Sequence, residues 1–314
     1  MGAVMTHRNL SVDTLKGIGI ILMIVAHTYG PNNIIWDLIF SFHMPLFFIV
    51  SGLFFKERSV KDTIWKISRQ LLIQYIFICI SIIILSQIKR PHPITSDLEE
   101  VLYGMGPGWF IIAMAQVRLY FTLIYKTFKR FYLIISLTIS LLTAILISIF
   151  QISMILAFMP ALCSLFFYAF GYSIKSYQIK NHVNRYPHIS LFAGLLLWLN
   201  SSFFGEVELA SCTFKLFIID FMGSIGGTYV FYVVSKKIVN TKLGILLSFT
   251  GKYSLAILCI HSIDFCIPLW YRLEPYIPNQ YYLTTILIMR LSLVLICCFI
   301  ISRHHKLRSF FNIK

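Results

Sequence analysis

Residues 131–149, FYLIISLTISLLTAILISI, form a stretch of the chain that contains no charged side chain. A membrane hydrocarbon core about 30 Å thick is crossed by roughly 20 apolar residues in an α-helix. The stretch therefore has both the length and the composition of a transmembrane helix. A helix suits this environment because it satisfies its backbone hydrogen bonds within the segment.

The same pattern recurs along the whole chain, which is 58% hydrophobic and 12% charged, with a mean hydropathy of +0.80. Soluble domains carry about 25% charged residues, so a soluble globule is excluded. The sequence predicts an all-α polytopic membrane protein of about ten transmembrane helices, forming one domain over residues 1–314. The predicted spans are 15–30, 34–55, 67–88, 108–126, 131–149, 152–174, 188–205, 213–235, 253–271 and 281–302.

The net charge of +15 would fit nucleic-acid binding in a soluble protein, but the cations lie in short clusters between the apolar runs. With the N-terminus inside, the inner segments hold most of the 27 lysines and arginines. Cytoplasmic loops of membrane proteins carry this excess. Both termini are therefore predicted to be cytoplasmic, and no nucleic-acid partner is expected. The inner clusters are 56–69, 126–130, 175–185, 236–252 and 303–314.

The apolar residues 243–250 are too few to cross a membrane, and they are predicted to form an interfacial helix before the ninth span. Ionisable side chains within a span are costly and usually face a cavity or a partner. The first span holds Asp13, Lys16 and His27. Asp13 and Lys16 are three residues apart and can pair.

Lys16 and His27 share one helix face, about 16 Å apart along its axis. The alternative is that Lys16 anchors the helix at the interface and His27 lies among the outer headgroups.

Two further spans place histidines at depth. Pro45 is predicted to bend the second span and to free carbonyls beside His43, which would then face the bundle interior or bind a neighbouring helix. In the ninth span His261 and Asp264 are three residues apart, so the carboxylate could orient the imidazole, or the pair could be structural.

The arginines inside the spans leave two interpretations open. Arg118 and Arg290 could bind an anionic group, or they could pair with Asp220 or Asp264. Sequence alone does not distinguish these possibilities.

Four short elements occur in an order typical of one family. They are SVDTLKGIGI at 11–20 with the later His27, FHMPLFFIVSG at 42–52, GWFI at 108–111, and GKYSL at 251–255 followed by His261. Together they resemble the acyltransferase-3 family of membrane O-acyltransferases, and within it the subgroup similar to fucose 4-O-acetylase and polysaccharide acetyltransferases. Many members have arginine where this chain has Lys16, which cannot offer a planar bidentate fork.

The resemblance implies transfer of an acyl group, usually acetyl, from acyl-CoA to a hydroxyl of a cell-surface glycan or its lipid-linked precursor. The expected location is the bacterial inner or plasma membrane, in contact with membrane lipids. Acetyl-CoA would be a donor substrate, with no bound cofactor and no metal. The implied catalytic residues are His27, His43 and His261; the residues implied in donor binding or motif support are Asp13, Lys16, Trp109 and Asp264.

The implied chemistry suits histidine, whose imidazole can take the proton of a sugar hydroxyl as that hydroxyl attacks the thioester. This role is assigned to His27, with Lys16 meeting the phosphates or amides of CoA at the inner mouth of a polar channel. A covalent acyl-histidine is an alternative route. The alternative function is a secondary transporter of a small anionic or sugar-like solute, since ten helices with buried charges also suit that class.

Overall fold

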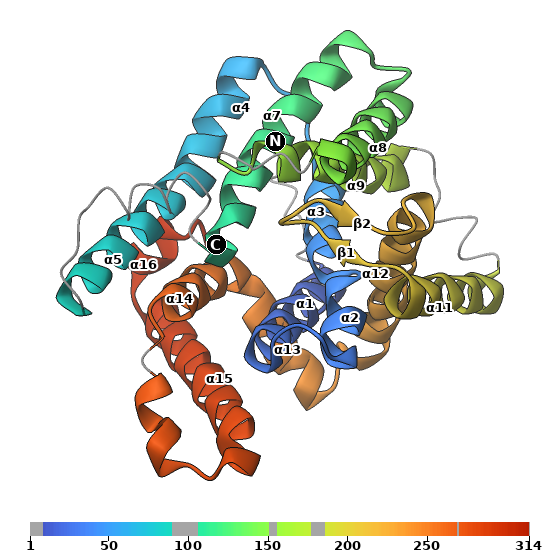
Figure 1. Cartoon of the computed structure of the whole chain (residues 1–314). Coiled ribbons are helices and arrows are strands. Elements are labelled where there is room, and N and C mark those ends of the chain that lie inside the picture. Colours follow the sequence, from blue (N-terminus) through green and yellow to red (C-terminus); the bar gives the residue numbers. More distant parts are fainter. Residues whose placement is uncertain (1–8, 90–105, 151–155, 177–185, 269, 314) are drawn as a thin grey trace.

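The computed structural model describes residues 9–89, 106–150, 156–176, 186–268 and 270–313, and this part of the chain is almost entirely helical (Figure 1). Its only strands pair in one short antiparallel hairpin. In chain order the elements are α1 (Leu10–Tyr29), α2 (Ile34–Phe40), α3 (His43–Leu53), α4 (Val60–Ile67), η1 (Ser68–Leu72), α5 (Ile73–Lys89), η2 (Gly106–Gly108), α7 (Trp109–Thr127), α8 (Tyr132–Phe150), α9 (Phe158–Ser176), α11 (Pro187–Phe204), β1 (Val207–Glu208), β2 (Thr213–Phe214), α12 (Ile218–Ile238), α13 (Lys242–Lys252), α14 (Ser254–Cys266), η3 (Trp270–Tyr276), α15 (Asn279–Arg303) and α16 (His305–Phe310).

The prediction of an all-α polytopic membrane protein is confirmed. Within the described residues, eight helical segments are long and apolar enough to cross a membrane, or nine if the bent pair of α13 and α14 counts as one span. The predicted span at 152–174 corresponds to α9, a 19-residue helix that is not among them. The number ten therefore stays a prediction.

The second span departs from its prediction, because it does not bend at Pro45. It breaks at Ser41 and Phe42, between α2 and α3, and Pro45 lies in the first turn of α3. A proline is tolerated there because the first N–H groups of a helix have no intrahelical acceptor.

Side chains satisfy the carbonyls that this break frees. The Leu38 carbonyl accepts hydrogen bonds from Ser41 Oγ and Trp198 Nε1, and the Ser41 carbonyl accepts one from Ser224 Oγ. The break is thereby fixed against α11 and α12, so it is a defined feature of the fold.

Helix α1 lies at the centre of the bundle and packs against α2, α3, α12, α13, α14 and α15. Of the 18 residues in its most apolar stretch, 61% are buried. The corresponding share is 17% in α11 and 22% in α15, which lie at the periphery. Helices α1 and α13 cross closely because a glycine of each helix contacts the backbone of the other. A Cβ atom on Gly17 would clash with the Leu247 carbonyl, and one on Gly251 with that of Asp13.

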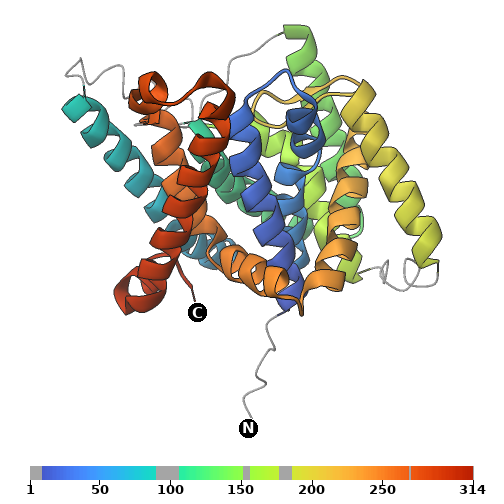
Figure 2. The ribbon, with the colours of Figure 1, turned by 90° about the horizontal axis from the view of Figure 1, so that it is seen from below.

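The predicted helix at 243–250 is confirmed as α13, which turns by 73° into α14. Figure 2 shows α13 lying across the same end of the bundle at which α1 begins and α16 is found, while η3 lies at the opposite end. The first described residues and the C-terminal helix thus share one side of the bundle. The assignment of that side to the cytoplasm stays a prediction from the loop charges.

Candidate functional site

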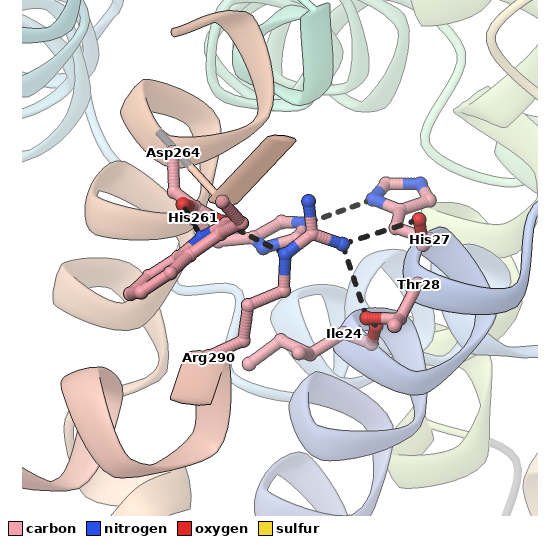
Figure 3. A network of polar contacts seen from close by, with 7 residues as sticks. Ile24, His27, Thr28, His261, Asp264 and Arg290 are labelled. Carbon is pink, nitrogen blue, oxygen red and sulfur yellow. Dashed lines mark hydrogen bonds and ion pairs between the residues drawn. The ribbon is translucent and has the colours of Figure 1, made fainter. Parts of the chain in front are cut away.

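Two histidines from distant parts of the sequence meet near the end of α1 (Figure 3). His27 lies in the last turn of α1 and His261 in α14, and His27 Nδ1 is 2.8 Å from His261 Nε2. The two rings are almost parallel, with an interplanar angle of 18°. Because this contact occupies Nδ1 of His27, the Nε2 atom is the ring nitrogen left to face a substrate.

An ion pair lies directly beside the histidines. Arg290 Nε in α15 is 2.9 Å from Asp264 Oδ2 in α14, and both side chains are close to 90% buried. The indole N–H of Trp270 donates to the other carboxylate oxygen. Of the two interpretations left open for Arg290, binding of an anionic group or pairing with an aspartate, the structure has the pairing, with Asp264.

Asp264 does not form the predicted contact with His261 that would orient the imidazole. The carboxylate is engaged by Arg290 and Trp270, whereas the hydrogen-bonding partner of His261 is His27. A spacing of three residues places two side chains on one helix face, but the stronger partner of a buried carboxylate is a buried cation from another helix.

Arg290 also holds the end of α1. Its Nη1 donates to Thr28 Oγ1 at 3.1 Å and, less closely, to the His27 carbonyl at 3.4 Å. The Thr28 hydroxyl in turn donates to the Ile24 carbonyl at 2.7 Å. One guanidinium thus connects α1, α14 and α15 around the histidine pair, as the dashed lines in Figure 3 show.

His43 is 1% exposed, so the prediction that it faces the interior is confirmed. Its Nδ1 lies 2.9 Å from the Ile39 carbonyl, across the break between α2 and α3. A carbonyl only accepts, so Nδ1 is the protonated nitrogen and a neutral His43 presents a lone pair at Nε2. The Phe40 ring lies close to both histidines, 4.6 Å from the ring centroid of His43 and 5.6 Å from that of His27.

At the other end of α1, Lys16 and Asp13 form the predicted ion pair, with Lys16 Nζ 2.9 Å from Asp13 Oδ1. Lys16 lines an open cavity of about 340 Å³, here called the mouth cavity. Four more cations line it and no carboxylate does: Lys56, Arg58, Lys66 and Arg118.

Among the cations that line this cavity, Arg118 lies at the middle of α7. Its Nη1 donates to Gln70 Oε1 at 3.3 Å and its Nη2 to Ser51 Oγ at 3.2 Å. Among the residues that the structure describes, it has no carboxylate partner. Asp220, the alternative partner, accepts instead from Ser201 Oγ and the Leu216 N–H.

Two smaller cavities follow along α1. The neck cavity, about 80 Å³, is lined by Ile20, Met23, Met44, Phe47, Phe110, Ser254, Leu255 and Leu258. The histidine cavity, about 20 Å³, is lined by Met23, His27, Phe40, Met44, Pro107, Trp109, Leu209 and Ala210. Neighbouring cavities share lining residues, so the three form a series from Lys16 to His27.

The series corrects the expected polar channel, because the neck between the charged mouth and the histidines is lined almost wholly by apolar side chains. Trp109, the first residue of α7, lines the histidine cavity beside His27. The short motif around Trp109 therefore contributes to the same end of the series as the histidine pair.

Sequence reasoning left the partner of Arg290 undecided and did not connect Ser51 or Gln70 with Arg118. Arg290 carried a signal, since it is a lone charge inside an apolar run. Ser51 and Gln70 carried none, because a lone uncharged polar residue in a helix is ordinary. Only the packing of α3 and η1 against α7 brings them to the guanidinium.

Among the residues that the structure describes, no group of three or more histidine, cysteine, aspartate or glutamate side chains could hold a metal ion. The profile of a protein family described as an acyltransferase domain matches residues 9–303. No curated protein matches the chain.

Proposed function

The chain belongs to the acyltransferase-3 family of membrane acyltransferases, and from this premise we propose that it moves an acetyl group from acetyl-CoA to a hydroxyl of a cell-surface glycan or its lipid-linked precursor. The observation that carries the proposal is the series of cavities that leads from a cavity lined by five cations to a buried histidine pair. The protein would act in the bacterial inner or plasma membrane, surrounded by lipids, with the mouth cavity on the cytoplasmic side.

The mouth cavity suits the charged part of CoA. Its volume of about 340 Å³ is within the range of small-molecule sites, although CoA would extend beyond it. Arg118 offers a planar fork of donors whose present partners are neutral, which favours a phosphate. Lys16, steadied by Asp13, would add a second positive charge.

The apolar neck suits the uncharged pantetheine arm. Apart from Ser254, its walls are isoleucine, methionine, phenylalanine and leucine side chains, which offer no charged partner to a phosphate. The thioester would then enter the histidine cavity while the phosphates remain at the mouth. The distance between the two ends, about 16 Å along α1, matches a donor with a long flexible arm.

At His27 the proposed step is a direct transfer. The step uses the tautomer of His27 in which Nδ1–H donates across the 2.8 Å contact to His261 Nε2, so that Nε2 of His27 can accept the proton of the acceptor hydroxyl. The hydroxyl oxygen forms a bond to the thioester carbon, and the carbon–sulfur bond breaks. The leaving thiolate takes the proton from His27, so the products are an acetyl ester and CoA with a free thiol.

The developing charge on the thioester oxygen needs a hydrogen-bond donor. We assign this role to the indole N–H of Trp109, which lines the cavity and donates to no described acceptor. The neutral His43 offers a lone pair and not an N–H at Nε2, so it fits the orientation of a substrate hydroxyl better than oxyanion binding. Asp264 supports the site through Arg290.

The test uses membranes from cells that express the full chain, incubated with acetyl-CoA labelled in the acetyl group. The expected result is label in envelope glycan that mild alkali releases as acetate, absent from membranes without the protein. Membranes that release no free CoA and incorporate no label would overturn the proposal. If sealed vesicles instead accumulate a solute without acylation, the protein is a transporter.

A further inference from the structure

Two methionines separate the neck cavity from the histidine cavity. Met23 in α1 and Met44 in α3 line both cavities, and no other residue does. Both are buried, with 1% and 8% of their surface exposed. Met23 lies four residues before His27, so the two share a face of α1. Any group that reaches the imidazole from the neck therefore passes between these side chains.

The space beyond the methionines is very small. A volume of about 10–15 Å³, counted as the space open to the centre of a water molecule, holds one water-sized group. The histidine cavity measures about 20 Å³, which accommodates the single methyl of an acetyl group but not a chain extended by further methylenes. The surrounding residues offer little room to expand, because His27, Phe40 and Trp36 contact one another.

Methionine is suited to a gate of this kind. Its unbranched side chain has three rotatable bonds and fills irregular gaps, so it can move aside for a thin flexible arm and then close around it. The aromatic residues of the neck cavity, Phe47 and Phe110, also line the mouth cavity. They therefore lie at the end of the neck cavity away from the methionines.

We propose that Met23 and Met44 form a gate that limits the transferred acyl group to acetyl. This inference rests on the proposed function, since it concerns the donor of the same site. The two side chains are specificity-determining residues, because they set the volume available beside the thioester carbon and take no part in proton transfer.

The experiment measures release of free CoA thiol by membranes containing the full chain, with acetyl-, propionyl- and butyryl-CoA as donors. Release by membranes with His27→Ala at the same protein level is subtracted. One methylene in an apolar pocket changes specificity by about 10–200-fold. Wild type should therefore prefer acetyl-CoA by about 10-fold or more, and Met23→Ala or Met44→Ala should raise the butyryl-to-acetyl ratio by a similar factor.

Two controls isolate the gate. Met→Leu at either position conserves volume and should keep the acetyl preference. Met114→Ala truncates a buried methionine that lines only the mouth cavity, and it should leave the ratio unchanged. If an alanine variant does not reach the membrane, Met23→Val or Met44→Val makes a smaller truncation and should shift the ratio in the same direction.

Each outcome has a distinct meaning. Wild type that uses acetyl- and butyryl-CoA equally, or truncations that keep the wild-type ratio, would overturn the gate while the acyltransferase proposal stands. An equal shift in Met114→Ala would overturn it as well. Wild-type membranes that release no more CoA from any donor than membranes without the protein would overturn both proposals.

Discussion

The two ends of the cavity series differ in size, charge and partners. The mouth cavity is open, about 340 Å³, and lined by five cations without a lining carboxylate. The histidine cavity is about 20 Å³ and mostly apolar, and Arg290, which lies beside the histidine pair, is matched by Asp264. Positive charge thus gathers at the open end of the series, and a buried ion pair lies beside the histidines at the other end.

Under the proposed function, this difference separates donor binding from chemistry along α1. Changes at the mouth should alter the affinity for the donor, which is a property of the ground state. Changes at the histidine pair should alter the rate of the chemical step, or the integrity of the structure that supports it. Four variants, ordered from the largest expected effect to the smallest, test this separation.

His27→Ala should have the largest effect. Removal of a general base lowers turnover by about 10²–10⁴-fold, with little change in the KM for acetyl-CoA because the mouth is untouched. The measurement is label transfer by membranes with matched protein levels. Unchanged turnover would remove His27 from the chemistry and make the pair structural.

Arg290→Gln tests the buried ion pair. Loss of one partner of such a pair leaves the other charge uncompensated and destabilises a protein by about 3–5 kcal/mol. The expected result is a lower Tm in detergent, whereas the double variant Asp264→Asn with Arg290→Gln should recover part of the loss. A double variant no more stable than Arg290→Gln alone would contradict the pairing.

His261→Gln addresses the orientation of His27. A displaced catalytic group can cost about 10²-fold in rate, and glutamine keeps a hydrogen-bonding side chain without the imidazole. Turnover should fall less than in His27→Ala while the KM for acetyl-CoA is kept. A fall in turnover equal to that of His27→Ala would mean that His261, and not His27 alone, carries the proton.

Arg118→Gln should have the smallest effect and a different kind of effect. The KM for acetyl-CoA should rise about 10-fold, equivalent to about 1.4 kcal/mol, with turnover preserved. Arg118→Lys should rescue it only in part, since lysine lacks the planar fork.

The matched control for Arg118→Gln is Lys61→Gln. This variant removes an exposed positive charge on α4 outside the mouth cavity and should change nothing. An equal rise in KM in both variants would point to a general surface effect and not to a phosphate site.

Much of this arrangement could be predicted locally. Helix α1, the Asp13–Lys16 pair and the short helix α13 follow from apolar length and from the reach of side chains three residues apart. The position of the break in the second span could not be predicted locally. Pro45 predicts a bend at its own position, but it lies in the first turn of α3, where a proline does not disturb the helix. The break depends on partners from α11 and α12, more than 150 residues away.

By itself the sequence determined the class of the protein and the identity of the groups available for chemistry. Apolar runs of membrane-spanning length are a local property, and so is the presence of a histidine or an arginine inside one. The tertiary structure alone decided which of these groups meet. His27 and His261 are 234 residues apart, and Arg290 is a further helix away. A buried charge takes the partner that packing brings within hydrogen-bonding distance, and no spacing along one helix specifies a partner on another.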